Sequence, residues 1–298
     1  MKKESFYLLT FIVGVFAVSF FARSWLVSEP APAGESHPSY QRIVSLAPSI
    51  TECLFAVGAG DQMVGVTNYC EYPEEANSLT KVGGHYDLNY ETLISLKPDL
   101  VVCLPSSPEI HQRLRALDIE VMPVESSSVS GIMQSLIQLG EKTGNLAEAE
   151  KVVADMEMRI AKVKAQRVDE PSRKILVSIG QNTGEAAVQN LFIAGRNNFY
   201  DDLITLLGCE NVYAGEVAYP AVSHEGLIRM NPEVIFEMTP EDELENSIQL
   251  ERVWKRQALL DAVKLDNVFV LAGDYVVKPG PRVVDLLELM AEKMKSSR

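Results

Sequence analysis

The amino-acid sequence predicts an α/β protein made of two similar lobes joined by one long helix. Three observations predict this fold: a helix-turn-strand unit that occurs twice, a regular alternation of strand and helix patterns, and an uninterrupted helical stretch between the halves. Strands that alternate with helices are typical of parallel sheets covered by helices on both faces. At 298 residues, the chain is also long enough for two domains that each bury a core.

The repeated unit is the most specific of these observations. Its first copy is NYETLISLKPDLVVCLP, from Asn89, and its second is SHEGLIRMNPEVIFEMTP, from Ser223. Each copy predicts a short capped helix, a turn marked by Pro and an apolar strand. The superposed positions are Glu91 on Glu225, Leu93 on Leu227, Ile94 on Ile228, Pro98 on Pro232 and Asp99 on Glu233. A weaker second pair, RIVSLA from Arg42 and KILVSIG from Lys174, predicts a buried strand that opens each half.

The stretch 145–168 predicts the connecting helix, because it contains neither Gly nor Pro and consists mostly of good helix formers. Asn145 is expected to cap its N-terminus, with Glu148 completing a capping box. A helix of about 20 residues spans roughly 30 Å, which is enough to join two lobes. The alternative interpretation is an ordinary amphipathic surface helix. Its apolar stripe comprises Val152, Met156, Ile160 and Val163.

Residues 1–27 have the pattern of an export signal or N-terminal membrane anchor. Lys2 and Lys3 precede a run without charge from Phe6 to Ala22, and Arg23 follows it. The length of the run lies between that of a signal-peptide core and a short membrane span, so cleavage and retention both stay open. Residues 28–40 are rich in Pro and small side chains and are expected to form a linker.

The N-terminal α/β lobe is assigned to residues 41–144 and the C-terminal α/β lobe to 169–298. The N-terminal lobe is expected to begin with the strand 42–47 and a helix whose capping box is Ser49 to Glu52. Its further elements are the strand 63–67, the first repeat copy, the apolar segment 119–124 and the helix 129–142. The C-terminal lobe is expected to contain the strand 174–179, an irregular stretch over 181–198, the helix 199–207, the second copy, the strand 267–272 and the helix 283–295.

Composition and motifs exclude several functions. The net charge of −14 and the pI near 4.8 argue against nucleic acid as a partner, because phosphates require a basic surface. The sequence contains no phosphate-binding loop, nucleophile elbow, zinc-protease motif or Cys-x-x-Cys pair, so we expect no enzyme, no cofactor and no metal site. Cys53, Cys70, Cys103 and Cys209 permit disulfides in an exported protein, but core thiols fit them equally well.

Aromatic side chains occur in loops that follow predicted strands. Tyr69 and Tyr72 follow one strand, His85 and Tyr86 lie in a Gly-flanked loop, Tyr219 precedes the second repeat copy, and Tyr275 follows the last strand. Ligands bind at the carboxyl ends of strands in open α/β sheets. Two lobes that face each other would therefore line a cleft with flat rings suited to a large planar ligand. Each tyrosine taken singly fits simple loop packing as well.

From Gln41 onward, the chain resembles the helical-backbone substrate-binding proteins of ABC importers, and in particular their cobalamin-binding branch. The resemblance is carried by RIVSLAPSITE, VGVTNYCEYP, VGGHYDLNYETLISLKPDLVV, the long helix, YPAVSHEGLIRMNPEVI and GDYVVKPGPRVVDLL. It implies two Rossmann-like lobes bridged by one rigid helix, with the ligand held in the cleft between them. It also implies a monomeric protein located in the periplasm or another extracytoplasmic space. This protein would deliver a small metal-chelate ligand to an ABC permease dimer in the inner membrane.

The resemblance assigns roles to particular residues. Glu91 and Glu225 match the positions at which this family docks on Arg residues of the permease, one from each lobe. Their alternative role is that of acidic residues favoured at helix N-termini by the helix dipole. The expected ligand-binding residues are Tyr69, Tyr72, His85, Tyr86, Tyr219, Asp274 and Tyr275. Asp274 enters this set because it matches an acidic family position by the last loop.

The sequence leaves three ligands possible, and it leaves an enzymatic function as the alternative to a binding protein. The expected ligand is cobalamin or a related corrinoid, but His85 and Tyr86 stand where the cobalamin branch often has Trp. This difference introduces haem, whose iron His85 or Tyr86 could bind as an axial ligand. A ferric siderophore usually requires Arg or Lys in the cleft; only Lys278 and Arg282 lie in these loops, and the resemblance indicates a structural role for Arg282. The other class is an enzyme acting on metal-tetrapyrroles, for which the sequence shows no acid and base groups.

Overall fold

The computed structural model describes residues 39–84, 87–106, 108–184, 187–240 and 247–296. Tyr40–Arg298 forms one compact unit, and the expected export signal and most of the linker lie outside the described residues. No helix within the described ranges has both the length and the apolar character needed to cross a membrane.

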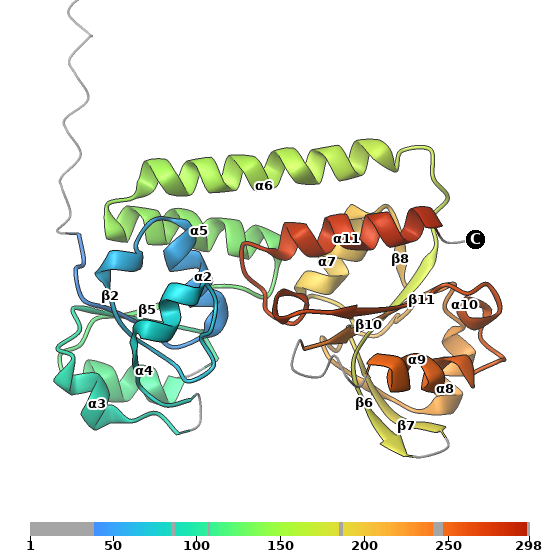
Figure 1. Ribbon diagram of the computed structural model, residues 1–298, viewed down its shortest axis with the longest axis horizontal. Coiled ribbons are helices and arrows are strands. Elements are labelled where there is room, and N and C mark those ends of the chain that lie inside the picture. Colours follow the sequence, from blue (N-terminus) through green and yellow to red (C-terminus); the bar gives the residue numbers. More distant parts are fainter. Residues whose placement is uncertain (1–38, 85–86, 107, 185–186, 241–246, 297–298) are drawn as a thin grey trace, which may run out of the picture. The chain divides into compact units, whose positions relative to one another are not determined.

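The N-terminal lobe is a parallel sheet with helices packed around it (Figure 1). Its five strands lie in the order β3-β2-β1-β4-β5, and every neighbouring pair is parallel, as the sequence predicts. The strands are β1 Ile43–Ser45, β2 Met63–Val66, β3 Thr80–Lys81, β4 Leu100–Cys103 and β5 Val121–Pro123. The helices are α2 Pro48–Ala56, η1 Gly60–Gln62, η2 Glu74–Ser78, α3 Tyr90–Ser95, α4 Pro108–Arg115 and α5 Val129–Thr143.

The C-terminal lobe contains a mixed sheet, with strand order β11-β10-β6-β7-β9 and β8 paired beside β6. Its strands are β6 Lys174–Gly184, β7 Ala187–Ile193, β8 Glu210–Asn211, β9 Ala221–Val222, β10 Val234–Thr239 and β11 Val268–Ala272. Its helices are α7 Phe199–Leu206, α8 His224–Met230, α9 Ser247–Lys255, α10 Asp261–Lys264, η4 Asp274–Val276 and α11 Val283–Ser296. The predicted α/β fold with two lobes is therefore confirmed.

The expectation of an irregular stretch over 181–198 was wrong up to Ile193 and right for 194–198. Strand β6 continues to Gly184, and β7 returns antiparallel to it before pairing with β9. The strand character is visible in β7, where Leu191 and Ile193 are buried and Phe192 between them is exposed. This alternation with a period of two residues is the signal of a strand that buries one face.

The two repeat copies share their hydrogen bonds as well as their sequence. Helices α3 and α8 are each capped by a side chain, because Asn89 accepts from the Thr92 amide and Ser223 from the Gly226 amide. After each helix, an acidic residue fastens the opening strand of its lobe. Asp99 accepts from the Arg42 amide at 2.9 Å, and Glu233 accepts from the Lys174 amide at 2.8 Å. The repeated unit thus joins the same two strands in each lobe, β1 to β4 and β6 to β10.

Both predicted capping boxes were wrong in detail. Asn145 precedes α6, but its side-chain nitrogen Nδ2 donates to the Thr143 hydroxyl, and the side chain forms no cap. Glu148 instead pairs with Lys151. In the other box, helix α2 already begins at Pro48 without a side-chain cap. The Glu52 carboxylate accepts hydrogen bonds from Arg282 instead.

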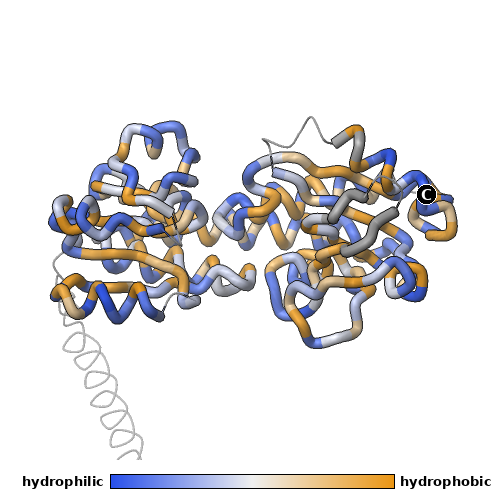
Figure 2. The backbone as a smooth tube through the Cα atoms, turned by 90° about the horizontal axis from the view of Figure 1, so that it is seen from below, coloured by the Kyte–Doolittle hydropathy of each residue, from blue (hydrophilic) through white to orange (hydrophobic). Residues whose placement is uncertain are grey.

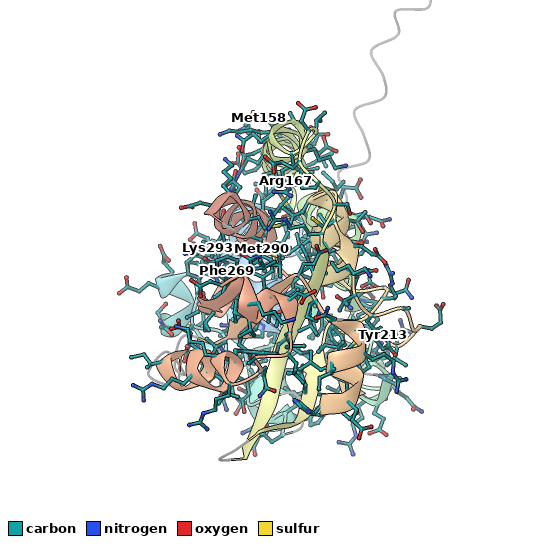
Figure 3. All side chains as sticks on the ribbon, turned by 90° about the vertical axis from the view of Figure 1, so that its right-hand side faces the viewer. Met158, Arg167, Tyr213, Phe269, Met290 and Lys293 are labelled. Carbon is teal, nitrogen blue, oxygen red and sulfur yellow. The ribbon has the colours of Figure 1, made fainter. Side chains whose placement is uncertain are left out.

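Helix α6, Leu146–Gln166, connects the lobes and contacts α5 in the N-terminal lobe and α11 and α7 in the C-terminal lobe (Figure 1). Met156 and Val163 from the predicted stripe are buried, and Val152 and Ile160 pack beside them. Met158 lies on the outer side of the helix, while Arg167 at its end donates to the Leu207 carbonyl (Figure 3). The helix is therefore packed on one face along its length.

One hydrophobic cluster continues through both lobes and α6. It includes Ile50 and Val102 from the N-terminal lobe, Met156 from α6, and Phe236 and Met290 from the C-terminal lobe. The sequence supplies apolar stretches to both lobes, as the backbone coloured by hydropathy shows (Figure 2). A further cluster in each lobe lies on another side of its sheet. The contact between the lobes is therefore partly a shared apolar core, which makes rigid packing of the two lobes favourable.

The four cysteines are free thiols in the structure, which answers the question that the sequence left open. Cys53, Cys70 and Cys103 are buried, and Cys209 is partly exposed. Cys103 Sγ lies 3.0 Å from His111 Nε2. Burial raises the pKa of Cys103 to about 12, so the thiol stays protonated beside the imidazole.

A buried carboxyl group lies beneath α9 in the C-terminal lobe. Glu237 of β10 is buried, accepts a hydrogen bond from Trp254 Nε1 at 2.9 Å, and forms no ion pair within the described part of the chain. Desolvation raises the pKa of Glu237 from 4.5 to about 7.

The Glu237→Gln substitution is expected to stabilise the protein at pH 8 and to be neutral near pH 4. Between pH 4.5 and 7, the native state holds a proton that the unfolded chain releases, so the stability of the natural protein falls as the pH rises. The cost at pH 8 is on the order of 3 kcal/mol, and it is absent when Gln replaces Glu. Urea unfolding at several pH values measures it, with the exposed Glu210→Gln as the control. Parallel pH profiles for Glu237→Gln and the natural protein would contradict the expectation.

Candidate functional site

The candidate site is centred on Arg282, which lies where loops of the two lobes meet. Its guanidinium donates to Glu52 of α2 through Nε at 2.9 Å and Nη2 at 2.7 Å. It also donates to Asp274 through Nη1 at 2.9 Å and Nη2 at 2.7 Å. Lys278 pairs more loosely with Asp274 at 3.5 Å. Arg282 therefore bridges a carboxylate from each lobe with bidentate geometry, the strongest form of this interaction.

Burial raises the pKa of a carboxyl group and neighbouring cations lower it, and the balance differs between Glu52 and Asp274. Only 3 % of the Glu52 side chain is exposed, and desolvation raises its pKa despite the hydrogen bonds from Arg282. Asp274 is more exposed; the hydrogen bonds and charges of Arg282 and Lys278 together outweigh its desolvation and lower its pKa. The cluster thus holds two acidic and two basic groups, and its net charge is close to zero when all four are ionised.

Two of the predicted aromatic residues surround the guanidinium. The Tyr72 ring lies over Arg282 at 3.7 Å from Cζ to the ring centroid, and the Tyr275 ring lies at 5.5 Å. Tyr72 comes from the N-terminal lobe and remains 45 % exposed, while Tyr275 belongs to η4 of the C-terminal lobe. The structure therefore brings Tyr72, Asp274 and Tyr275 together.

The loop that carries Tyr69 and Tyr72 is anchored by the buried thiol of Cys70. Cys70 Sγ lies 3.1 Å from the Thr51 hydroxyl and 3.0 Å from the Thr67 hydroxyl. Lys81 Nζ donates to the Cys70 carbonyl at 2.8 Å. These contacts fix the backbone between the two tyrosines, and a loop fixed in this way presents its aromatic rings in a defined direction.

The other predicted ligand-binding residues are less tightly held. Tyr69 is 64 % exposed and approaches Gly84, where an added Cβ would lie 3.0 Å from its ring. Tyr219 is 44 % exposed and precedes β9, and burial of its hydroxyl raises its pKa. His85 and Tyr86 lie outside the described residues.

Glu91 and Glu225 occupy equivalent positions in the two lobes. Each is exposed in the first turn of a capped helix, α3 for Glu91 and α8 for Glu225. Neither carboxylate has a side-chain partner within the described residues, although the helix N-terminus is a favourable place for a negative charge. The geometry leaves both carboxylates accessible to another molecule.

Sequence reasoning missed the central place of Arg282 and the role of Glu52. Glu52 carried a local capping pattern, and its partner Arg282 lies 230 residues away. No pattern of nearby residues indicates such a pair. Only the resemblance to the substrate-binding proteins of ABC importers indicated a role for Arg282, and that role was structural.

The described residues show no group of three or more His, Cys, Asp or Glu side chains placed to hold a metal ion. What they show is a two-lobed α/β fold with aromatic loops and a charge-balanced ion-pair cluster at the meeting of the lobes. Residues 43–275 match the family model described as periplasmic binding protein, and the chain belongs to this family.

Particular relatives are similar over nearly the whole chain. The vitamin B12-binding protein of Vibrio cholerae serotype O1 is 29 % identical over 273 residues, which cover 91 % of this chain and 92 % of that protein. An uncharacterised ABC transporter substrate-binding lipoprotein of Bacillus subtilis is 27 % identical and covers 85 % of this chain and 80 % of its own length.

Solved structures of the same fold are named for different ligands, vitamin B12 and heme. The periplasmic vitamin B12 binding protein BtuF of Vibrio cholerae has a TM-score of 0.73 at 28 % identity and covers 86 % of this chain and 97 % of its own. The periplasmic heme binding protein HutB of the same organism has a TM-score of 0.72 at 25 % identity, with coverage of 85 % and 98 %. The fold alone therefore does not separate corrinoid from haem.

Proposed function

We propose that this chain is the extracytoplasmic substrate-binding protein of an ABC importer, and that it binds cobalamin or a related corrinoid. The observation that carries the proposal is the similarity to the vitamin B12-binding protein of Vibrio cholerae, which extends over 91 % of this chain. Family membership supports a binding role without catalysis, a small-molecule ligand and a permease partner.

The chemistry of the candidate site favours this ligand over a ferric siderophore. Both cations of the cluster, Arg282 and Lys278, are already in ion pairs with carboxylates, so they are poorly placed to attract an anionic chelate. Exposed aromatic faces such as that of Tyr72 suit the ring face of a large planar macrocycle.

Haem is the second candidate, because the solved structures do not separate it from a corrinoid. The heme-binding protein HutB matches this fold almost as closely as BtuF does, with TM-scores of 0.72 and 0.73. We propose His85 and Tyr86 as the residues that would contact either ligand, with His85 or Tyr86 as the axial ligand of the iron if the ligand is haem.

Titration of the purified protein with cyanocobalamin, hemin and a ferric siderophore, followed by melting temperature, tests the proposal. A ligand held at 100 times its dissociation constant adds about 2.7 kcal/mol of stability, which corresponds to a rise of several degrees. We expect cyanocobalamin to give the largest rise. A rise with hemin alone would replace the corrinoid proposal with the haem proposal, and no rise with any of the three would contradict both.

A further inference from the structure

We infer that Arg282 is a positioning residue for ligand binding: it sets the direction of the Tyr72 ring, so that part of the binding surface depends on contact between the lobes. The inference rests on the proposed function and goes beyond it, because it concerns how the binding surface is assembled. It begins from one juxtaposition, the Tyr72 ring of the N-terminal lobe lying on the Arg282 guanidinium of the C-terminal lobe.

The edges of the guanidinium are occupied by carboxylates, which leaves its flat faces for other contacts. Nε and Nη2 donate to Glu52, and Nη1 and Nη2 donate to Asp274, all at 2.7–2.9 Å. Four bonds in one plane fix the orientation of that plane. Arg282 consequently offers a ligand few free donors and serves as a flat, immobile support for a ring.

One face of the Tyr72 ring lies on the Arg282 guanidinium, and a large part of the Tyr72 surface stays exposed. The distance of 3.7 Å between Cζ and the ring centroid is that of direct stacking, and 45 % of Tyr72 is exposed. The backbone of its loop is held separately, because Cys70 bonds to Thr51 and Thr67. The ring direction is therefore the degree of freedom that Arg282 controls.

The support is assembled from both lobes. Glu52 belongs to α2 of the N-terminal lobe, whereas Asp274 and Arg282 follow β11 of the C-terminal lobe. A second polar contact between the lobes lies elsewhere, where Asp202 of α7 accepts from the Val129 amide at 2.8 Å. The two lobes are thus joined by polar contacts at two places, and the contact through Arg282 is also the one on which the Tyr72 ring lies.

The first test observes Tyr72 directly in the protein without ligand. Tyr72 is replaced by 3-fluorotyrosine, and its ¹⁹F resonance is recorded in the natural background, in Arg282→Lys and in Lys278→Met. Arg282→Lys keeps the positive charge but loses the planar fork, so we expect the resonance to move toward that of a solvent-exposed tyrosine. Lys278→Met removes a neighbouring cation for which the structure shows no stacking on Tyr72, and it should leave the resonance in place. A resonance that is unchanged in Arg282→Lys would overturn the inference.

The second test measures affinity for cyanocobalamin by calorimetry in Arg282→Lys, Tyr72→Ala and the double variant. Each single substitution is expected to weaken binding roughly tenfold, and the double variant should be about as weak as Tyr72→Ala alone. Glu150→Ala changes an exposed residue of α6 outside the candidate site and should bind as well as the natural protein. Losses that multiply in the double variant would show that Arg282 acts independently of Tyr72, which would overturn the inference.

The two tests separate this inference from the proposed function. If the natural protein binds neither cyanocobalamin nor hemin, the proposed function fails, and the fluorine resonance alone decides whether Arg282 orients Tyr72. If hemin binds instead, the same set of variants is measured with hemin.

Discussion

Replacement of both Glu91 and Glu225 by Ala is expected to abolish uptake while ligand affinity changes by less than about twofold. The two carboxylates lie exposed at equivalent helix N-termini, one on each lobe, and would meet matching cations on a two-fold permease. Each single substitution should lower uptake about tenfold or more. Uptake of labelled ligand by cells that contain no other binding component measures the effect, and calorimetry measures the affinity.

Glu150→Ala is the matched control, because Glu150 is also exposed but lies on the connecting helix α6. It should leave uptake unchanged. If the double variant of Glu91 and Glu225 transports normally, the permease docks elsewhere. The carboxylates would then serve only the local electrostatics of α3 and α8.

The Arg282→Met substitution is expected to lower the free energy of unfolding by about 3–5 kcal/mol at pH 8, because it leaves Glu52 buried without a counter-ion. Burial already raises the pKa of Glu52 with Arg282 present, and without Arg282 the pKa should rise further. The native variant would then hold a proton that the unfolded chain releases, so its stability should decrease as the pH increases from 5 to 8. Urea unfolding at both pH values measures this difference.

A more exposed ion-pair network supplies the control. Arg159 of α6 pairs with Glu288 of α11 at 2.6 Å and also with Asp285, but all three side chains are partly exposed. Arg159→Met should therefore cost only about 1 kcal/mol. The double variant Glu52→Gln with Arg282→Met should recover part of the loss. Equal losses for Arg282→Met and Arg159→Met would indicate that burial of Glu52 is unimportant.

The sequence predicted the fold because its main signals are local or repeated. The two helix-turn-strand copies around Glu91 and Glu225 became α3 with β4 and α8 with β10, down to the carboxylates that fasten each opening strand. The connecting helix was equally clear, since a long run without Gly or Pro has few other conformations available. Both signals can be read within about 25 residues of chain.

The predictions from sequence were wrong or incomplete where contacts between distant residues determined the local structure. The strand β7 carries polar residues beside its apolar ones, so its alternation became evident only from the buried Leu191 and Ile193. Glu52 fitted a capping box, but its carboxylate gains more from a bidentate partner in the other lobe. Grouping Tyr72, Asp274 and Tyr275 around one cation likewise required the folded chain.

The pairing of Glu52 with Arg282 also has a consequence for the order in which the chain folds. The two residues are 230 positions apart, and ribosomes release the N-terminal one first. The N-terminal lobe can form its parallel sheet early, but Glu52 must wait for almost the entire chain before its counter-ion arrives. We therefore expect closure of the interface between the lobes to be a late folding event. A nascent or truncated chain that ends before Arg282 would leave Glu52 without its counter-ion and would expose the apolar interface between the lobes to chaperones and proteases.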